Sequence, residues 1–425
     1  MKLSPSTISR RAILATAATT SLMASAACSR STAGDSAGGK ALQMFVNMGA
    51  DTPQAAAMNK IVASYQQETG QAIQVTAVST GFENQMKVRL ASKDIPDLFS
   101  THGWSLLRYS SFLERLTDRS WAADVNPQLD SSMRDANGDI YAFPGETNVA
   151  GVLYSQKALA AAGVDAAQLT SWEAFGTAAD ALLAAGITPI SCSGKDQGPA
   201  GHIADHLAID TFTDEQLQAM KDGTFQADAY DEVLTRVAQW RDGRWFNPDY
   251  ASASQDDMAH ALADGTAGFA FLGTSLLSQA LTYAPAAALG FCPLPPTHGT
   301  EPYLVGGEGN LAFGVSKTST QKEAALAFLD HLAKPENAAA LAESTGSAPG
   351  LSSVQVDFGS LASSYEAYVT PGKVPVKPYF DRVYLPNGAW DTVVATTDSV
   401  ISGQGSVEDA VTQMQRQYET LYGQQ

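Results

Sequence analysis

Residues 40–80 read KALQMFVNMGADTPQAAAMNKIVASYQQETGQAIQVTAVST. The first ten residues are a short apolar run typical of a buried strand, and the last ten alternate as a strand does. Between them Met58, Ile61 and Tyr65 follow helical spacing, and Gly70 suits a helix C-cap. A strand–helix–strand unit predicts a parallel sheet with a right-handed crossover, so the predicted fold class is α/β.

The next segments continue this alternation. Residues 82–104 predict a second helix and then a strand at 97–100. Further on, Asn137-Gly138 is a signal for a tight turn between two strand-like runs. A calcium loop is the alternative for Asp135, Asn137 and Asp139, but their spacing departs from the EF-hand pattern, and we favour the turn.

The N-terminus has the features of an export signal. Residues 12–27 carry no charge and are shorter than the roughly 20 residues needed to span a membrane. Arg10 and Arg11 precede them, so residues 1–27 are predicted to be a signal peptide similar to a twin-arginine signal. Cys28 follows small residues and resembles a lipobox cysteine, although a plain signal with an incidental cysteine is the alternative. Residues 28–40 then read as a flexible, lipidated tether.

Composition narrows the function. The chain has 425 residues and a formal net charge of −18, which argues against nucleic acid and anionic membrane surfaces as partners. Its length and 44% hydrophobic content predict two domains or one two-lobed unit. Cys192 and Cys292 could form a disulfide, but each lies in an apolar strand-like run, so two buried free thiols are favoured.

Six segments in a fixed order resemble a known family. They include FENQMKVRLASKDIPDLF, YAFPGETNVAGVLYSQKALAAAGVD and VISGQGSVEDAVTQMQ, and the six together occupy residues 82–99, 141–165, 170–182, 261–273, 309–350 and 400–415. The combination looks like an extracellular sugar-binding protein of an ABC importer, of the maltose-binding-protein type. The resemblance covers nearly the whole chain after the tether.

The resemblance implies two α/β lobes joined by three chain crossings, with the ligand in the cleft between them. Crossings are expected near 145–151, 305–310 and 347–353. Lobe 1 would comprise residues 41–148 and 308–350, and lobe 2 residues 149–307 and 351–425. The expected function is capture of a carbohydrate, preferably an oligosaccharide, for the permease subunits of an ABC importer. The protein would be a monomer without cofactor, held at the extracellular face of the membrane by a lipid on Cys28.

Aromatic side chains that could stack on a sugar ring are the first binding candidates. Trp390 stands where maltose-binding relatives place a stacking tryptophan, and it begins a predicted helix. His102 and Trp104 follow a strand's carboxyl end, the edge at which open α/β sheets bind ligands. Each of the three could instead be structural. Trp172, Trp240 and Trp245 are predicted to be core residues, and Trp121 is left unassigned.

Polar candidates lie in the crossings and in nearby loops. A contact with the ligand and a purely structural role both remain open for these residues. The polar candidates are Glu146, Asn148, Lys195, Asp196, His202, Thr274, Glu308 and Asn310. His202 and His206 could share a helix face as zinc ligands, but no third ligand is evident, and no metal is predicted.

Two other function classes are kept as alternatives. One is a secreted carbohydrate-active enzyme, in which Glu146 and Glu308 would face each other across the cleft. The other is a binding protein for a non-sugar solute such as a peptide. No nucleophile elbow, HExxH motif or P-loop is present in the sequence, which favours binding over catalysis.

Overall fold

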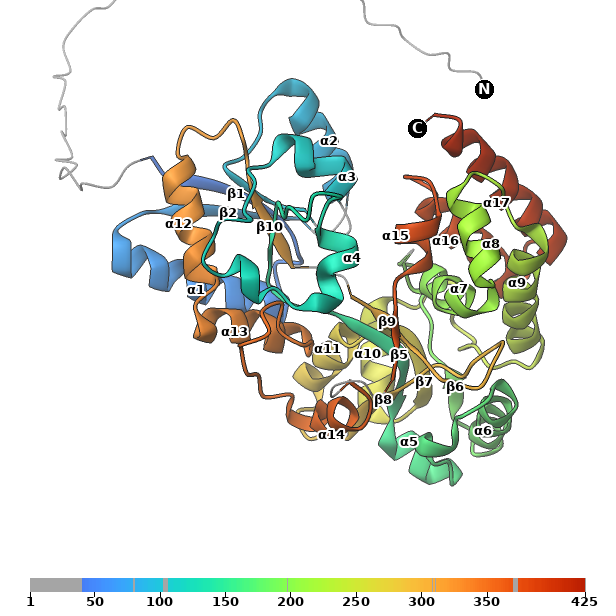
Figure 1. Ribbon diagram of the computed structural model, residues 1–425. Helices are drawn as coiled ribbons and strands as arrows, with labels where there is room; N and C mark the ends of the chain where they lie inside the picture. The colour runs from blue at the N-terminus through green and yellow to red at the C-terminus, as the bar shows by residue number, and fades with distance from the viewer. Residues whose placement is uncertain are drawn as a thin grey trace, which may run out of the picture. The chain divides into compact units, whose positions relative to one another are not determined.

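The computed structural model describes residues 40–78, 81–101, 106–196, 198–307, 309, 311–369 and 374–424. Within these residues the chain forms two β-sheets, each accompanied by helices (Figure 1). No helix in these ranges is long and apolar enough to cross a membrane. The predicted signal peptide, the tether as far as residue 39, and Cys28 lie outside the described residues, as do His102, Trp104, Glu308 and Asn310.

The first sheet has the strand order β2-β1-β3-β10-β4. β1 pairs in parallel with β2 and β3, whereas β10 runs antiparallel to β3 and β4. The strands are β1 Leu42–Asn47, β2 Ile73–Val78, β3 Leu98–Ser100, β4 Phe143–Pro144 and β10 Ala312–Val315. The predicted strand–helix–strand unit is therefore confirmed. Its helix α1 (Pro53–Thr69) ends at Gly70, whose φ of 75° is left-handed as predicted.

Helices cover both faces of this sheet because its strands are apolar on both sides. Leu42, Met44 and Val46 of β1 join a core formed with α1, α12 (Lys322–Leu332) and α13 (Pro335–Thr345). Phe45 faces the other way and packs with α2 (Phe82–Ser92) and α3 (Leu106–Tyr109). Figure 1 shows α1, α12 and α13 gathered on one side of the sheet.

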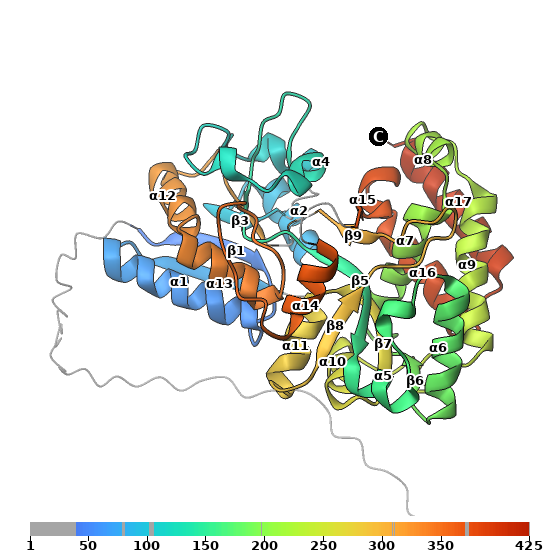
Figure 2. The ribbon, with the colours of Figure 1, turned by 60° about the horizontal axis from the view of Figure 1, so that its bottom comes forward.

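The second sheet has the order β11-β9-β5-β7-β6, and β8 also pairs with β5. β5 is antiparallel to β7, β8 and β9, while β6 is parallel to β7. Its strands are β5 Val149–Ser155, β6 Thr188–Ile190, β7 Ala267–Gly273, β8 Leu289–Cys292, β9 Leu304–Gly306 and β11 Val376–Lys377. Figure 2 shows β5, β7 and β8 running beside one another.

Successive side chains of β5 point to opposite faces of the sheet and pack into two separate cores. Ala150 and Val152 face one core, and Val149 and Leu153 face the other. The first core packs against α5 Gln156–Ala162, α6 Trp172–Ala184, α7 Gly198–Thr211, α8 Asp214–Lys221, α9 Ala227–Asp242, α15 Phe380–Tyr384, α16 Trp390–Ile401 and α17 Val407–Tyr422. The second packs against α10 (Gln255–Asp264) and α11 (Ser275–Tyr283), with the single turn α14 (Ala362–Ser364) beside β8.

The chain passes between the sheets in three segments, the second of which includes residues 308 and 310, outside the described part of the chain. It leaves the first sheet after Pro144 and enters the second at Val149, and it returns between Gly306 and Ala312. After α13 it moves from the first-sheet core, which still includes Val354, to the second-sheet core at Leu361. The first and third segments are bound together, since Thr147 N–H donates to Ala348 O at 2.7 Å.

The interior residues predicted from the sequence are where they were expected. Trp240 is 3% exposed, and Trp172 and Trp245 pack on the same core around Phe175. Trp121, which the sequence left unassigned, is 6% exposed, and its Nε1 donates to Asp330.

Two further predictions are confirmed. Cys192 and Cys292 are buried free thiols. At the predicted tight turn, the Asp135 carboxylate accepts the backbone N–H groups of Asn137 and Asp139, and Gly138 has a φ of 80°. Such side-chain-to-backbone bonds are how aspartate stabilises a turn.

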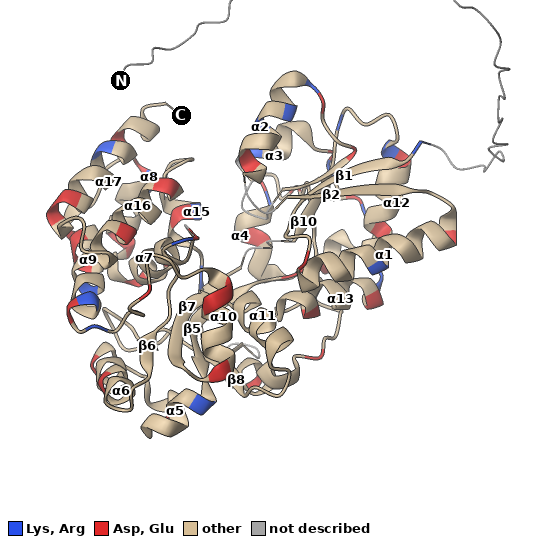
Figure 3. Cartoon of the chain, turned by 180° about the vertical axis from the view of Figure 1, so that it is seen from behind, with Lys and Arg blue, Asp and Glu red and all other residues tan. Residues whose placement is uncertain are grey.

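Acidic side chains outnumber basic side chains on the helices. Asp and Glu recur on the helices of both sheets, and Lys and Arg are sparser (Figure 3). The acidic excess read from the sequence is therefore carried by the surface helices.

Candidate functional site

Trp390 is the first residue of α16 and lies against α7. Its ring is partly buried, and its centroid is 5.0 Å from the His202 ring at an interplanar angle of 58°. The Arg382 guanidinium carbon lies 5.5 Å from the centroid of the indole. The indole can come this close because α7 has no side chain at Gly201, where a Cβ would lie 2.9 Å from Trp390 Cη2.

Tyr379 joins this tryptophan to the first crossing. Its ring centroid lies 6.0 Å from His202 and 5.7 Å from His206, and the side chain is 2% exposed. Its hydroxyl accepts a hydrogen bond from Asn148 Nδ2 at 3.1 Å. Two residues predicted separately from the sequence, Asn148 and His202, thus meet at one tyrosine, and His202 also contacts the third, Trp390.

The two histidines of α7 are uncharged. Burial lowers the pKa of His202 to about 3, and the nearby Arg382 charge contributes to that fall. Burial also lowers the pKa of His206, which is 0% exposed, with a smaller contribution from His202. Neutral imidazole offers one donor and one acceptor, which suits hydroxyl groups better than it suits ions.

Several polar atoms in the cluster have unused hydrogen-bonding capacity. Asn148 Oδ1, His202 Nδ1 and both ring nitrogens of His206 are buried and have no hydrogen-bond partner among the described residues. Buried polar atoms without a partner are uncommon, so they are candidates for contact with a ligand or water. Together with the Trp390 and Tyr379 rings, they give an aromatic site with neutral donors and acceptors.

His202 and His206 also lie on one face of α7, with ring centroids 5.5 Å apart. Among the described residues no group of three His, Cys, Asp or Glu side chains is placed to hold a metal ion. The structure therefore gives this pair no third ligand within the described part of the chain.

Lys195 and Asp196 occupy an exposed loop with a clear structural use. Asp196 Oδ2 accepts the backbone N–H of Gln255 at 2.6 Å, at the beginning of α10. The Lys195 N–H donates to Ala253 O at 3.2 Å. A carboxylate at a helix N-terminus stabilises the unpaired N–H groups there, so these contacts explain the loop without a ligand.

Thr274 and Glu146 are both buried: Glu146 lies in the first connection between the sheets, and Thr274 lies between β7 and α11. Thr274 is 1% exposed, and its hydroxyl lies 3.3 Å from Ser347 Oγ. Glu146 is also 1% exposed, and its Oε1 accepts the Leu311 N–H at 3.3 Å. Glu146 therefore ties the first crossing to the second.

Tyr379 and Arg382 are the members of the cluster that sequence reasoning missed. Both lie in KPYFDR, residues 377–382, only a few positions before Trp390. An aromatic and a cation so close to the predicted stacking tryptophan are a signal that could have drawn attention to this segment.

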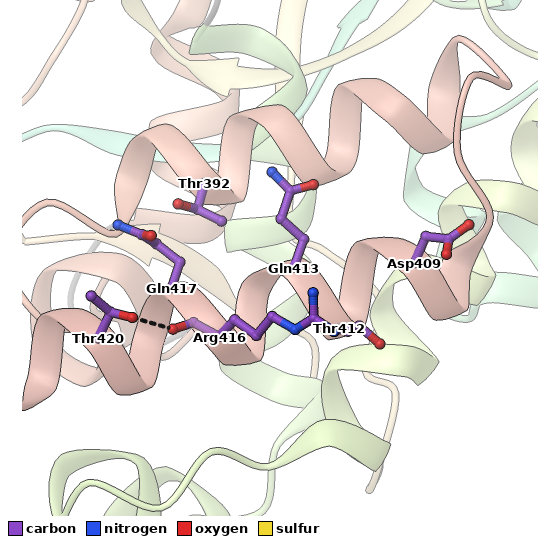
Figure 4. A pocket seen from close by; sticks show the side chains of 7 residues that line it. All are labelled: Thr392, Asp409, Thr412, Gln413, Arg416, Gln417 and Thr420. Atoms are coloured by element: carbon purple, nitrogen blue, oxygen red, sulfur yellow. Dashed lines mark hydrogen bonds between the residues drawn. The ribbon is translucent and has the colours of Figure 1, made fainter.

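A surface hollow lies elsewhere, between α16 and α17. It has a volume of about 510 Å³ and is lined by Thr392, Asp409, Thr412, Gln413, Arg416, Gln417 and Thr420. Figure 4 shows Gln413 and Gln417 extending from α17 toward α16, with Thr420 bonded to its own helix at Arg416 O. None of the predicted site residues lines it, and it lacks an aromatic wall.

Comparisons with known proteins agree with this fold. Residues 60–367 match the family described as bacterial extracellular solute-binding protein. The melibiose/raffinose/stachyose-binding protein MelE of Bacillus subtilis is 29% identical over 393 residues, which are 90% of each chain.

Two solved structures are similar over nearly the whole chain. The binding protein MsmE from Bacillus subtilis, in an open conformation, is 28% identical with a TM-score of 0.79, covering 91% of this chain and 98% of that one. A sugar transporter protein from Bacillus licheniformis in complex with stachyose is 26% identical with a TM-score of 0.80, covering 90% and 100%. The chain therefore has the two-lobed α/β fold of these proteins and belongs to the bacterial extracellular solute-binding protein family.

Proposed function

We propose that this protein captures an oligosaccharide with the cluster formed by Asn148, His202, Tyr379 and Trp390. The observation that carries the proposal is the partly exposed Trp390 ring, which lies beside His202 in a cluster of neutral polar groups with unused hydrogen-bonding capacity, held together by the buried Tyr379. A sugar has apolar C–H faces and a belt of hydroxyls, and it needs this combination of surfaces. Arg382 beside Trp390 adds a donor at the edge of the cluster.

The ligand class proposed is a galactose-containing oligosaccharide of the melibiose, raffinose and stachyose series. MelE is named for binding these three sugars, and the Bacillus licheniformis structure contains stachyose. Both proteins are similar to this chain along nearly its whole length, which supports a related ligand.

The protein is proposed to deliver its ligand to an ABC importer as a monomer. A lipid on Cys28 and the tether up to residue 40 would hold it at the outer face of the membrane. Residues 41–148 and 308–350 would form lobe 1, and residues 149–307 and 351–425 lobe 2. Of the remaining candidates His102, Trp104, Glu308 and Asn310 would line the interlobe cleft, and Lys195, Asp196, Thr274 and Glu146 would border it.

Binding without catalysis is the proposed activity. Glu146 is buried and already accepts the Leu311 N–H, which makes it poorly placed as half of a hydrolytic carboxylate pair. A peptide ligand is disfavoured because the imidazoles of the cluster are neutral and its cation Arg382 is already paired with Asp381, whereas a peptide terminus needs charge compensation.

Calorimetry tests the proposal directly. Purified protein without residues 1–28 is titrated with melibiose, raffinose, stachyose, maltotriose and a tripeptide. We expect saturable binding of at least one of the three galactose-containing sugars, a melting temperature that rises with its concentration, and unchanged sugar after long incubation. Binding of the tripeptide alone, or hydrolysis of the sugar, would contradict the proposal.

A further inference from the structure

Two buried carboxyl groups meet beside the candidate sugar-binding cluster. Asp205 of α7 is 0% exposed and Asp381 of α15 is 8% exposed. The Asp381 backbone N–H donates to Asp205 Oδ1 at 2.7 Å, which brings the two carboxyl groups next to each other. The pair therefore joins α7 to the short segment that carries Tyr379 and Arg382.

Each of the two carboxyl groups has one oxygen that accepts no hydrogen bond from the described residues. Arg382 Nη1 pairs with Asp381 Oδ2, but Asp381 Oδ1 and Asp205 Oδ2 are buried and accept no hydrogen bond from any described residue. Two ionised carboxylates can only accept and would repel each other. A single proton on the pair turns one carboxyl group into a donor and removes one of the two negative charges, so that the groups attract each other. Because Arg382 stabilises the ionised form of Asp381, the proton belongs on Asp205.

The surroundings favour a neutral Asp205. Burial raises the pKa of Asp205 well above its usual range, and the Asp381 charge raises it further. Burial also raises the pKa of Asp381, although Arg382 opposes that change. The titratable or charged side chains that face the pair from the packed elements are His202, His206, Tyr230, Tyr303 and Arg382. Since both histidines are held neutral by burial, the compensating positive charge comes from Arg382.

We infer that Asp205 carries a proton that it donates to Asp381, and that this carboxyl pair positions Tyr379 and Arg382 on α7. Asp205 and Asp381 are positioning residues, which act on the ligand through the side chains they hold. The part of the inference that concerns ligand affinity rests on the proposed function, whereas the shared proton and the docking of α15 do not.

The first test measures the proton through its effect on folding. Asp205→Asn keeps an acceptor for the Asp381 N–H and supplies an N–H donor that does not titrate. Above the unfolded aspartate pKa of about 3.9, the unfolded chain has lost a proton that the folded wild-type protein still holds, because the folded pKa of Asp205 is raised. Stability from this group is therefore complete at low pH and falls as pH rises. Relative to Asp205→Asn, the wild-type unfolding constant should therefore rise with pH, by at most about tenfold per pH unit.

Urea unfolding at several pH values measures these unfolding constants. The contribution of histidine titration is the same in wild type and Asp205→Asn, because both carry the same histidines, so it drops out of the difference between them. Asp210→Asn is the matched control, because Asp210 lies on the same helix but pairs with Lys377 Nζ at 2.6 Å. Asp210→Asn should lower stability while keeping the wild-type dependence on pH. Parallel curves for wild type and Asp205→Asn would overturn the shared proton. A carbonyl stretch of protonated carboxylic acid in the infrared spectrum at pH 7, lost in Asp205→Asn, would support it.

The second test measures positioning without a ligand. In Asp205→Ala the amides of residues 379–384 should lose protection from hydrogen exchange, and Asp205→Asn should restore the protection. If the alanine variant keeps full protection, the positioning role is wrong.

With raffinose as the calorimetric probe, Asp205→Ala should bind about tenfold more weakly and Asp205→Asn about as well as wild type, since a buried hydrogen bond is lost only in the first. If no sugar binds to the wild-type protein, the proposed function fails, while the urea and exchange measurements still decide the carboxyl pair.

Discussion

At the scale of single residues, Trp390 has both a packing role and an open face. Its ring contacts α7 at Gly201 and His202, yet the side chain stays partly exposed beside Arg382. A fully buried core tryptophan such as Trp240 leaves no such face for a ligand. The partial exposure of Trp390 is therefore what favours a stacking role over a purely structural one.

Trp390→Ala should therefore weaken oligosaccharide binding roughly 30- to 1000-fold, because a buried stacking aromatic contributes about 2–4 kcal/mol to binding. The packing against α7 predicts some loss of stability too, but less than for a core tryptophan. Calorimetry gives the affinity, and a melting curve without ligand gives the stability. Trp390→Phe, which retains a ring, should recover most of the binding. Normal affinity in the alanine variant would exclude the stacking role.

The burial of His206 predicts that the folded protein becomes less stable as the pH falls. Its folded pKa is lowered by burial, whereas in the unfolded chain it is near 6.5. Stability from the neutral histidine is thus present above about pH 6.5 and is lost as pH falls below it. Urea midpoints at pH 7.5 and pH 5 should differ less in His206→Leu than in wild type. His298→Leu, at a side chain that is 52% exposed, is the control and should keep the wild-type difference. A pH response in His206→Leu equal to that of wild type would contradict this account.

At the level of residues, the sequence singles out a candidate where its place in a local pattern is distinctive, and its role as a ligand contact stays a prediction. Trp390 at a helix start and Asn148 in a crossing were singled out in this way, and the structure places Trp390 beside His202 and Asn148 beside Tyr379. Tyr379 itself was missed because its contacts are with α7, far away in the sequence. Asp196 has a structural contact that the sequence did not reveal, since its carboxylate accepts the backbone N–H of Gln255 at the beginning of α10, and its place beside the cleft stays a prediction.

At the scale of elements, local periodicity predicted α1 and its two flanking strands because each has a regular apolar pattern and a clear end signal. The order of the second sheet was not predictable in this way. β5 pairs with β7, β8 and β9, which come more than a hundred residues later in the chain. Pairing over such separations depends on the packing of the whole lobe, which no local pattern contains.

Gly201 of α7 offers a test at this scale, because the helix must come close to α16. A Cβ at Gly201 would lie 2.7 Å from Val394 Cγ2 and 2.9 Å from Trp390 Cη2. Gly201→Ala should push α16 and the indole away, lowering the melting temperature and weakening sugar binding about tenfold. A Cβ at Gly198 meets nothing within 4 Å. Gly198→Ala on the same helix should therefore leave sugar binding unchanged, and it should leave the stability of the fold unchanged or raise it by up to about 1 kcal/mol. Equal behaviour of the two variants would show that this close approach does not matter for the site.

At the scale of the whole molecule, the two sheets are linked by bonds between crossings. Thr147 donates to Ala348 O, and Glu146 accepts from Leu311, so segments far apart in sequence are fixed to one another where the chain changes sheet. Rearrangement at a few such connecting residues is how two-lobed proteins close around a ligand. The acidic surface helices fit a neutral ligand, which does not depend on charge for its affinity.

The anchoring of the molecule is a prediction of the sequence that can be tested in cells. Cys28→Ser removes the thiol that would carry the lipid, and a single lipidated residue followed by a Gly- and Ser-rich leash is the proposed attachment. Fractionation of producing cells should therefore find the variant in the medium and the wild type with the membranes. Cys192→Ser and Cys292→Ser are matched controls, because both thiols are buried and free, and both variants should stay with the membranes. The strain should lack the importer's permease, since docking to it could retain an unlipidated protein. If Cys28→Ser still sediments with the membranes of that strain, the protein is held by something other than a lipid on Cys28.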